Sequence, residues 1–319
     1  MNKIVSFFAK DKIARALNKK TYALYDEILD VLDEYTNVVL PEQQKLNGHE
    51  HFRTKEIEEK IISLIDENED VLLIQNVKGK NIGHIAASLH LENIVLKALD
   101  NNEASLQQDK VGMNIGMFCA REKMLTCLMK ALDNEEASLQ QDEMGFNIGM
   151  LSVQPGLESA VKKALQNEKA SIQQNMYSQN IGMLTAIHHM EELTLLALDN
   201  EVASTQRNGL FENIGMLSAK AEMESCVLKA LDNKMAAIQQ NVYGQNIGMI
   251  CLDRGMKSCV QKALENKEVR TQRDNCRDSL SYLAWVNGYE THQTKVERDN
   301  KDIVENLIES TTETGSMEA

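Results

Sequence analysis

The feature that most constrains this chain is a tripeptide, Asn-Ile-Gly, that returns every 33 residues without insertion or deletion. It begins at Asn81, Asn114, Asn147, Asn180, Asn213 and Asn246. An Ala-Leu pair and columns of Asn, Gln and Asp or Asn keep the same period. A fixed period of this size predicts a solenoid, in which each repeat buries its apolar face against its neighbours. We therefore expect six repeats to fill residues 81–278.

The first repeat predicts two short helices and a connecting arm. Asn81 is a good N-cap, because its side-chain oxygen accepts from the free N–H groups of the first turn. Residues 82–89 then form a first helix, and residues 91–100 have the apolar spacing of an amphipathic second helix. Asn101 follows at a position where a left-handed C-cap is expected. Residues 104–112 form the arm, where the Gln column is expected to bind backbone groups of the neighbouring arm.

Two other columns predict core positions. The residue two positions after His84 is small in every repeat, which lets helices approach closely: Ala86, Cys119, Ser152, Thr185, Ser218 and Cys251. The His84 column becomes Met in the five later repeats and is expected to fill space. Three second-helix cysteines, Cys127, Cys226 and Cys259, are predicted to be buried, because free Cys behaves as a small hydrophobe.

Both ends of the chain are expected to cap the solenoid, since terminal repeats need a polar outer face. We assign residues 1–80 to an N-terminal helical capping region, with one helix over 21–39. Residues 279–309 are predicted to form a modified repeat and C-terminal cap, beginning at the N-cap Ser279. Residues 310–319 form a short polar tail.

Composition narrows the class of partner. The formal charge is −14, with 34 basic and 48 acidic residues. Such a chain repels phosphate, so we expect no nucleic-acid partner, and no apolar run reaches the roughly 18 residues of a membrane span. The six cysteines form no CxxC pair and suggest no disulfide framework. We therefore expect the protein to lie in a reducing compartment such as the cytoplasm. We also expect it to be a monomer.

The sequence contains no catalytic or phosphate-binding motif of a familiar kind. A Gly-rich phosphate loop, HExxH, GxSxG and an EF-hand loop are all missing. His49 and His51 form an HxH in a polar stretch, which is interpreted as solvated because it lacks a third ligand. We therefore expect no cofactor, no metal and no catalytic residue.

One pattern indicates binding. The arm ends between the Asp/Asn column and the next Asn cap vary, while the columns around them stay fixed. Four of the five aromatic residues within 81–278 lie there, and exposed aromatic residues in a row indicate a partner surface. The alternative is that these rings pack on the neighbouring arm. The candidate partner-binding residues are Val111, Met113, Met144, Phe146, Tyr177, Leu210, Phe211 and Tyr243.

The repeats resemble those of the ankyrin family. Residues 81–87, Asn-Ile-Gly-His-Ile-Ala-Ala, look like the family's Thr-Pro-Leu-His-x-Ala-Ala, and residues 90–95 look like its turn and second helix. The sequence departs in replacing Thr-Pro by Asn-Ile and His by Met. The resemblance implies an all-α, ankyrin-like solenoid of helix-turn-helix repeats that binds proteins through its arm ends and adjoining helices.

The leading functional prediction is a non-enzymatic scaffold for protein–protein interaction. A narrower interpretation is a bacterial effector that acts on host proteins after delivery into a host cell, since the polar tail resembles those of such effectors. The alternative is a modifier or enzyme whose active part lies in residues 1–80.

Overall fold

The computed structural model describes residues 19–39 and 50–289 of the chain. The chain divides into two compact units, residues 1–170 and 171–319. Within the described residues the secondary structure is helical, apart from one isolated antiparallel bridge between Arg273 and Ser279. His49, residues 290–309 of the predicted C-terminal cap and the polar tail lie outside the described residues.

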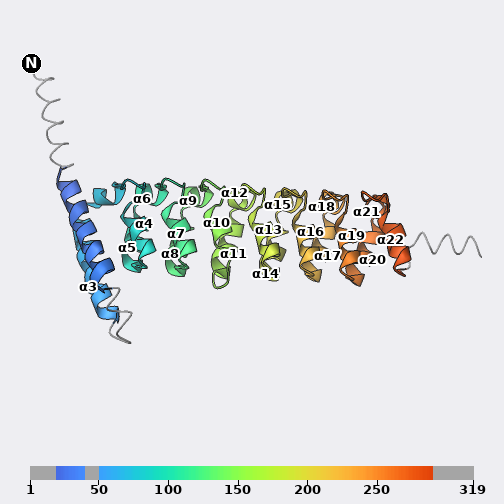
Figure 1. Ribbon diagram of the computed structural model, residues 1–319, viewed down its shortest axis with the longest axis horizontal. Coiled ribbons are helices and arrows are strands. Elements are labelled where there is room, and N and C mark those ends of the chain that lie inside the picture. The colour runs from blue at the N-terminus through green and yellow to red at the C-terminus, as the bar shows by residue number, and fades with distance from the viewer. Residues whose placement is uncertain (1–18, 40–49, 290–319) are drawn as a thin grey trace, which may run out of the picture. The chain divides into compact units, whose positions relative to one another are not determined.

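The first unit opens with a helix over residues 19–34 and the π-helical turn η1, Tyr35–Val39. Its remaining helices follow in chain order (Figure 1): α3 Glu50–Glu67, the 3-10 helix η2 Glu69–Leu73, α4 Ile82–Ser88, α5 Glu92–Asp100, α6 Asn102–Leu106, α7 Ile115–Arg121, α8 Leu125–Ala131, α9 Glu135–Leu139, α10 Ile148–Leu151, α11 Glu158–Gln166 and α12 Glu168–Ser171.

The second unit repeats the same set of three helices. They are α13 Ile181–Ile187, α14 Glu191–Ala197, α15 Glu201–Thr205, α16 Ile214–Lys220, α17 Glu224–Asp232, α18 Lys234–Ala237, α19 Ile247–Asp253, α20 Lys257–Glu265, α21 Lys267–Thr271 and α22 Leu280–Val286. In each unit the first helices stack on one another, as do the second helices. The predicted all-α solenoid is therefore confirmed.

The repeated Asn is both a helix cap and a tie within its repeat. Asn213 accepts from the N–H of Met216 at 2.9 Å, while its amide nitrogen donates to Ala236 O at 2.8 Å and to Gln239 Oε1 at 2.9 Å. Gln239 Nε2 then donates to Thr205 O of the preceding repeat at 2.7 Å. The predicted N-caps and the predicted role of the Gln column are confirmed, and the side chain of Asn213 is fully buried.

The repeated Ile and Gly fit one another across successive repeats. A Cβ added to Gly215 would lie 2.7 Å from Ile247 Cδ1 of the next repeat and 2.6 Å from Ala230 Cβ of its own second helix. Gly83, Gly116, Gly182 and Gly248 have the same surroundings, with Leu280 in place of Ile at the last. The glycine is thus required by packing, because its backbone is ordinary helix.

Gly215→Ala is expected to lower the free energy of unfolding by about 1–3 kcal/mol, because a well-packed site has no room for the added methyl. Helix propensity alone predicts the opposite sign, a gain of roughly 1 kcal/mol. Urea unfolding of the full chain decides between them. Gly209→Ala is the control, since its Cβ would meet only Tyr177 O at 3.9 Å and is expected to change little. A stabilised Gly215→Ala chain would contradict the packing argument.

Two local predictions are wrong. The arm is not irregular throughout, because α6 and its equivalents form a third short helix within it. Asn101 is not left-handed: it has φ −85° and caps α6 by accepting from the N–H of Ala104. One set of left-handed residues lies instead between the first and second helices, where His90, Lys123, His189 and Glu222 have φ between 56° and 58°. Asn and Asp tolerate both roles, so composition alone did not separate them.

The predicted core columns are buried. The Met residues that replace His84 are between 0% and 3% exposed. The small column and the second-helix cysteines are also buried, and the six cysteines are free, with Cys276 alone among them exposed.

The N-terminal segment packs on the first repeat. The helix over 19–34 lies beside α3 (Figure 1), and Asn68 Nδ2 donates to Thr21 Oγ1 at 2.8 Å. The buried carboxylate of Glu58 in α3 accepts from the backbone N–H of Asn93 at 3.0 Å and from its side-chain amide at 2.6 Å. A carboxylate at the start of α5 satisfies free N–H groups there, so α3 is fixed against α5.

Candidate functional site

The arm ends are five-residue turns, which we call tips: residues 109–113, 142–146, 175–179, 208–212, 241–245 and 274–278. Each begins at the Asp/Asn column, whose side chain closes the turn. In the fourth tip, Asn208 Oδ1 accepts from the N–H of Leu210 and from that of Glu212, both at 2.9 Å. Short polar side chains of this kind bind backbone groups two residues ahead, which explains why the column is restricted to Asp and Asn.

Neighbouring tips of one unit are bonded through their backbones. In the second unit, Gly209 N donates to Tyr177 O at 3.2 Å and Val242 N donates to Leu210 O at 3.1 Å. Asn275 N continues the series by donating to Tyr243 O at 3.1 Å. In the first unit, Glu143 N donates to Val111 O at 3.0 Å. Within each unit, therefore, the tips hold fixed positions relative to one another.

The third residue of a tip faces solvent. The residues at this position are 44–59% exposed: Val111 and Met144 in the first unit, and Tyr177, Leu210 and Tyr243 in the second. All five are candidate residues from the sequence. Tyr177 and Tyr243, at 52% and 59%, are unusually exposed for large aromatic side chains.

The fifth residue of a tip turns inward, which corrects one expectation. Met113 was expected on an exposed tip but is 8% exposed. Its sulfur lies 3.8 Å from Arg121 Nη1, and its carbonyl oxygen lies 3.0 Å from Nε2 of the buried His84. Phe146 occupies the same position and is half-buried. The position leads directly into the next Asn cap, so its side chain packs beside the first helix.

The fourth residue of a tip is left-handed. It is Gly112, Gly145 and Gly244 in three tips, but Ser178 with φ 58°, Phe211 with φ 62° and Arg277 with φ 70° in three others. A bulky residue is rare in this region, because its Cβ approaches the following carbonyl. Phe211 is nevertheless 50% exposed, with the Arg207 guanidinium 5.0 Å from its ring centroid.

The two units differ in how much apolar surface their tips expose. In the first unit, the exposed large apolar side chains of the tips are Val111 and Met144. In the second unit they are Met176, Tyr177, Leu210, Phe211, Val242 and Tyr243. Met176 and Val242 were not among the candidate residues, although both lie in the same variable turns. The second unit thus exposes six such side chains on four tips, against two on two tips in the first, and the exposed aromatic residues of the tips, Tyr177, Phe211 and Tyr243, all lie in the second unit.

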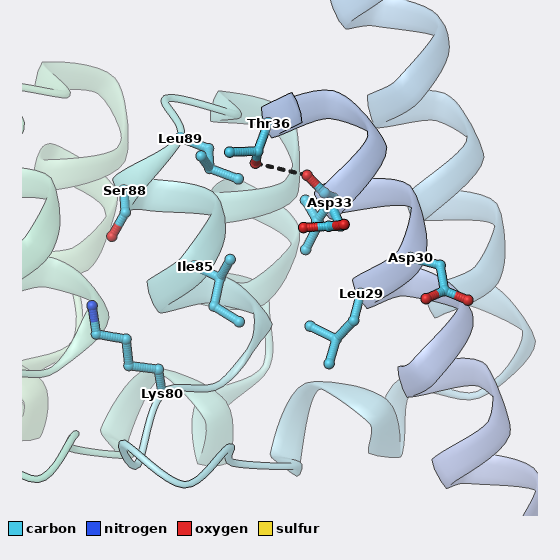
Figure 2. A pocket seen from close by; sticks show the side chains of 9 residues that line it. Leu29, Asp30, Asp33, Thr36, Lys80, Ile85, Ser88 and Leu89 are labelled. Carbon is cyan, nitrogen blue, oxygen red and sulfur yellow. Dashed lines mark hydrogen bonds between the residues drawn. The ribbon is translucent and has the colours of Figure 1, made fainter. Parts of the chain in front are cut away.

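A pocket of about 500 Å³ lies between the helix over 19–34 and α4. Figure 2 shows Leu29 and Ile85 on its opposite sides, with Lys80 at its margin. The hydroxyl groups of Thr36 and Ser88 donate to carbonyls of their own helices, Leu32 O at 2.8 Å and His84 O at 3.0 Å, so neither is paired with a base. The carboxylates that line it belong to exposed residues, and the pocket therefore offers little of the desolvated polarity that fixes small ligands.

Lys80, which lines this pocket, also belongs to a cluster around the buried ring of Phe118. Lys80 Nζ and Arg121 Cζ each lie 4.5 Å from the ring centroid of Phe118, and His84 meets that ring edge to face. Burial lowers the pKa of His84 to about 4, against the opposing effect of its hydrogen bond to Met113 O. His84 is therefore neutral at pH 7, and it joins α4 to the tip that ends the same repeat.

Residues 19–39 and 50–289 also bear on metal binding and on membrane insertion. No group of three or more His, Cys, Asp or Glu side chains there is placed to hold a metal ion. None of the helices over 19–39 and 50–289 has the length and apolar character that crossing a bilayer requires.

Comparison with known proteins gives the fold. No family model matches the sequence. No curated protein matches it either. The ankyrin repeat domain of Bcl-3, a member of the IkappaB protein family, is 12% identical and superposes with a TM-score of 0.51, covering 65% of this chain and 92% of that one. An ankyrin repeat domain from Acinetobacter baumannii AYE is 13% identical, with a TM-score of 0.49, and the match covers 56% of this chain and 94% of that one. The chain has an ankyrin-repeat-like fold, as its sequence predicted.

Proposed function

We propose that this ankyrin-like solenoid is a non-enzymatic scaffold that binds a protein partner through its tips. The observation that carries the proposal is the set of exposed apolar side chains on backbone-bonded turns, above all Tyr177, Phe211 and Tyr243. Rigid elements that present aromatic side chains bind at low entropic cost, because few rotamers are lost.

The proposal also assigns a role to each segment of the chain. Residues 81–278 supply the binding repeats, and residues 1–80 cap the first unit through the contacts of α3 with α5. Residues 279–309 continue as a modified repeat, in which Ser279 caps α22 by accepting from the N–H of Tyr282 at 3.2 Å. The finer interpretation, a bacterial effector delivered into a host cell, rests on the composition of the last residues, which lie outside the described ranges. Cytoplasmic location, monomeric state and lack of a nucleic-acid partner belong to the same proposal.

The double variant Tyr177→Ser, Phe211→Ser tests the binding surface. We expect partner affinity to fall by about 2 kcal/mol or more, because buried aromatic anchors dominate interface energies. Circular dichroism and melting should change little, since exposed side chains contribute little to folding. Affinity is measured by calorimetry with a partner isolated on the intact chain.

The matched control is Ile187→Ser, Met235→Ser. It also removes two exposed apolar side chains from the second unit, but from α13 and α18 rather than from the tips. Equal losses of affinity in both double variants would contradict a tip-centred surface. A markedly lower melting temperature for the tip variant alone would show that the rings pack within the fold.

A further inference from the structure

The exposed charges of the second unit have one sign on the tips and on the residue that precedes each tip. Among residues 174–179, 207–212, 240–245 and 273–278, the exposed charged side chains are Arg207, Arg273 and Arg277. The acidic residues there are less accessible: Glu212 is 2% exposed and paired with Lys220 Nζ, and Asp274 and Asp278 are half-buried. On a chain with 14 more acidic than basic residues, this surface is a local exception.

Phe211 adds an independent observation. In the equivalent position of the next tip, a Cβ on Gly244 would lie 2.9 Å from the backbone nitrogen of Asn275. Glycine is therefore the residue that suits this position, both for its φ of 75° and for its close approach to the neighbouring tip. Phe211 occupies the same conformation with a bulky side chain and leaves half of its surface in water. Strain of this kind, kept where a smaller residue fits, is concentrated at functional sites.

The ring of Phe211 also orients a cation. Arg207 lies over it at 5.0 Å, and both side chains are exposed. A guanidinium that stacks on a ring keeps its N–H groups free at its edge, where it binds a carboxylate in a bidentate geometry. The ring can therefore contact an apolar side chain of a partner while the adjacent guanidinium binds a neighbouring carboxylate.

We propose that the tips of the second unit bind an extended acidic peptide segment of a partner protein. Its apolar side chains would pack on Tyr177, Leu210 and Phe211, and its carboxylates would pair with Arg207, Arg273 and Arg277. The backbone bonds between successive tips fix the spacing of these contacts before binding. This inference rests on the proposed function and names the chemistry of the partner.

A single-stranded nucleic acid is the competing ligand, because aromatic side chains and arginine also bind bases and phosphates. The number of cations disfavours it, since affinity for nucleic acid grows with the number of phosphates neutralised and this surface exposes three arginines. A dT20 oligonucleotide therefore serves as a second probe, at the same salt concentration as the peptides.

The first experiment selects binders from a random 12-residue peptide library displayed on phage, using the full chain. We expect selected peptides to combine Asp or Glu with aliphatic or aromatic residues. The charge-reversed variant Arg207→Glu, Arg273→Glu, Arg277→Glu should bind these peptides at least about tenfold more weakly, since charged hydrogen bonds are the stronger class. The same variant should instead select basic peptides.

Three results would overturn the inference. They are selected peptides without an acidic bias, unchanged affinity of the charge-reversed variant, and tighter binding of dT20 than of the selected peptides. Circular dichroism of the variant checks that it is folded, and calorimetry with the selected peptide on Arg207→Glu alone tests the cation that stacks on Phe211 without the larger charge change.

The second experiment uses the strain at Phe211. Phe211→Gly should raise the melting temperature by about 2–4 °C, because glycine adopts the left-handed conformation freely. It should also lower the affinity for the selected peptide by about 30-fold, the loss typical of a central aromatic anchor. Ser178→Gly is the control: it relieves the same conformation and should leave the affinity unchanged. A Phe211→Gly chain that keeps its affinity would contradict the anchor role.

The two proposals fail separately. If the Tyr177→Ser, Phe211→Ser variant binds the selected peptides normally, the tip surface itself is wrong. If that variant loses binding while charge reversal has no effect, the surface holds and the acidic partner chemistry is wrong.

Discussion

Asn213→Ala is expected to lower the free energy of unfolding by about 2–4 kcal/mol, a large effect for one polar side chain. The change removes the cap of α16, which is worth about 0.5–2 kcal/mol. It also leaves the half-buried Gln239 Oε1 without this donor, at about 1–3 kcal/mol for an unsatisfied group, and removes one of the donors to Ala236 O, which keeps the N–H of Gln239 at 3.2 Å. Urea unfolding followed by circular dichroism measures the loss.

Two further variants separate these contributions. Asn213→Ser keeps a capping oxygen but removes the amide donors, so its loss should be smaller than that of Asn213→Ala by about 1 kcal/mol. Asn287→Ala applies the same substitution to an exposed residue at the end of α22 and should cost less than about 0.5 kcal/mol. A loss below about 1 kcal/mol for Asn213→Ala would mean that the buried network is easily replaced by water.

Leu132→Ala is expected to destabilise the chain by about 2–5 kcal/mol, because a buried Leu leaves a cavity that the surrounding repeats fill only in part. Leu132 follows α8 and is 9% exposed, as the Ala-Leu column predicted. Leu125, at the start of the same helix, is 39% exposed and provides the control. Leu125→Ala should cost less than about 1 kcal/mol, and an unfolding midpoint that is equal in the two variants would contradict the helix register.

The caps and the core were predictable because they follow from local chemistry repeated many times. Asn before a helical segment is a cap in any context, and a column that is small or apolar in every repeat has to face a neighbour. Because the period is 33 residues, each such inference applies to the equivalent residue of all six repeats. Cys127 and Met216 were therefore predicted to be buried from their repeat position rather than from their residue type. The third helix was missed because a five-residue segment such as Asn102–Leu106 has too few turns to show helical periodicity.

The orientation of individual tip side chains could be predicted only in part from the sequence. The sequence identified the turns and their aromatic residues as a candidate surface, and the side chains of Tyr177, Phe211 and Tyr243 are exposed there. It could not place Met113 inside the fold, since its burial depends on Arg121 and His84, which approach it only after the helices pack. It also treated Phe211 as equivalent to Tyr177, although the two occupy different positions of the turn.

The sequence by itself determined the class of fold and the residues that cap and fill the helices, because these depend on contacts within one repeat or on a column shared by all. The tertiary structure alone decided which tip residues face solvent and why the glycine of Asn-Ile-Gly is needed. Both depend on the distance between adjacent repeats: Ile247 reaches the place where Gly215 would carry a Cβ, and one tip binds the backbone of the next. Distances of that kind arise from packing, and no single repeat contains them.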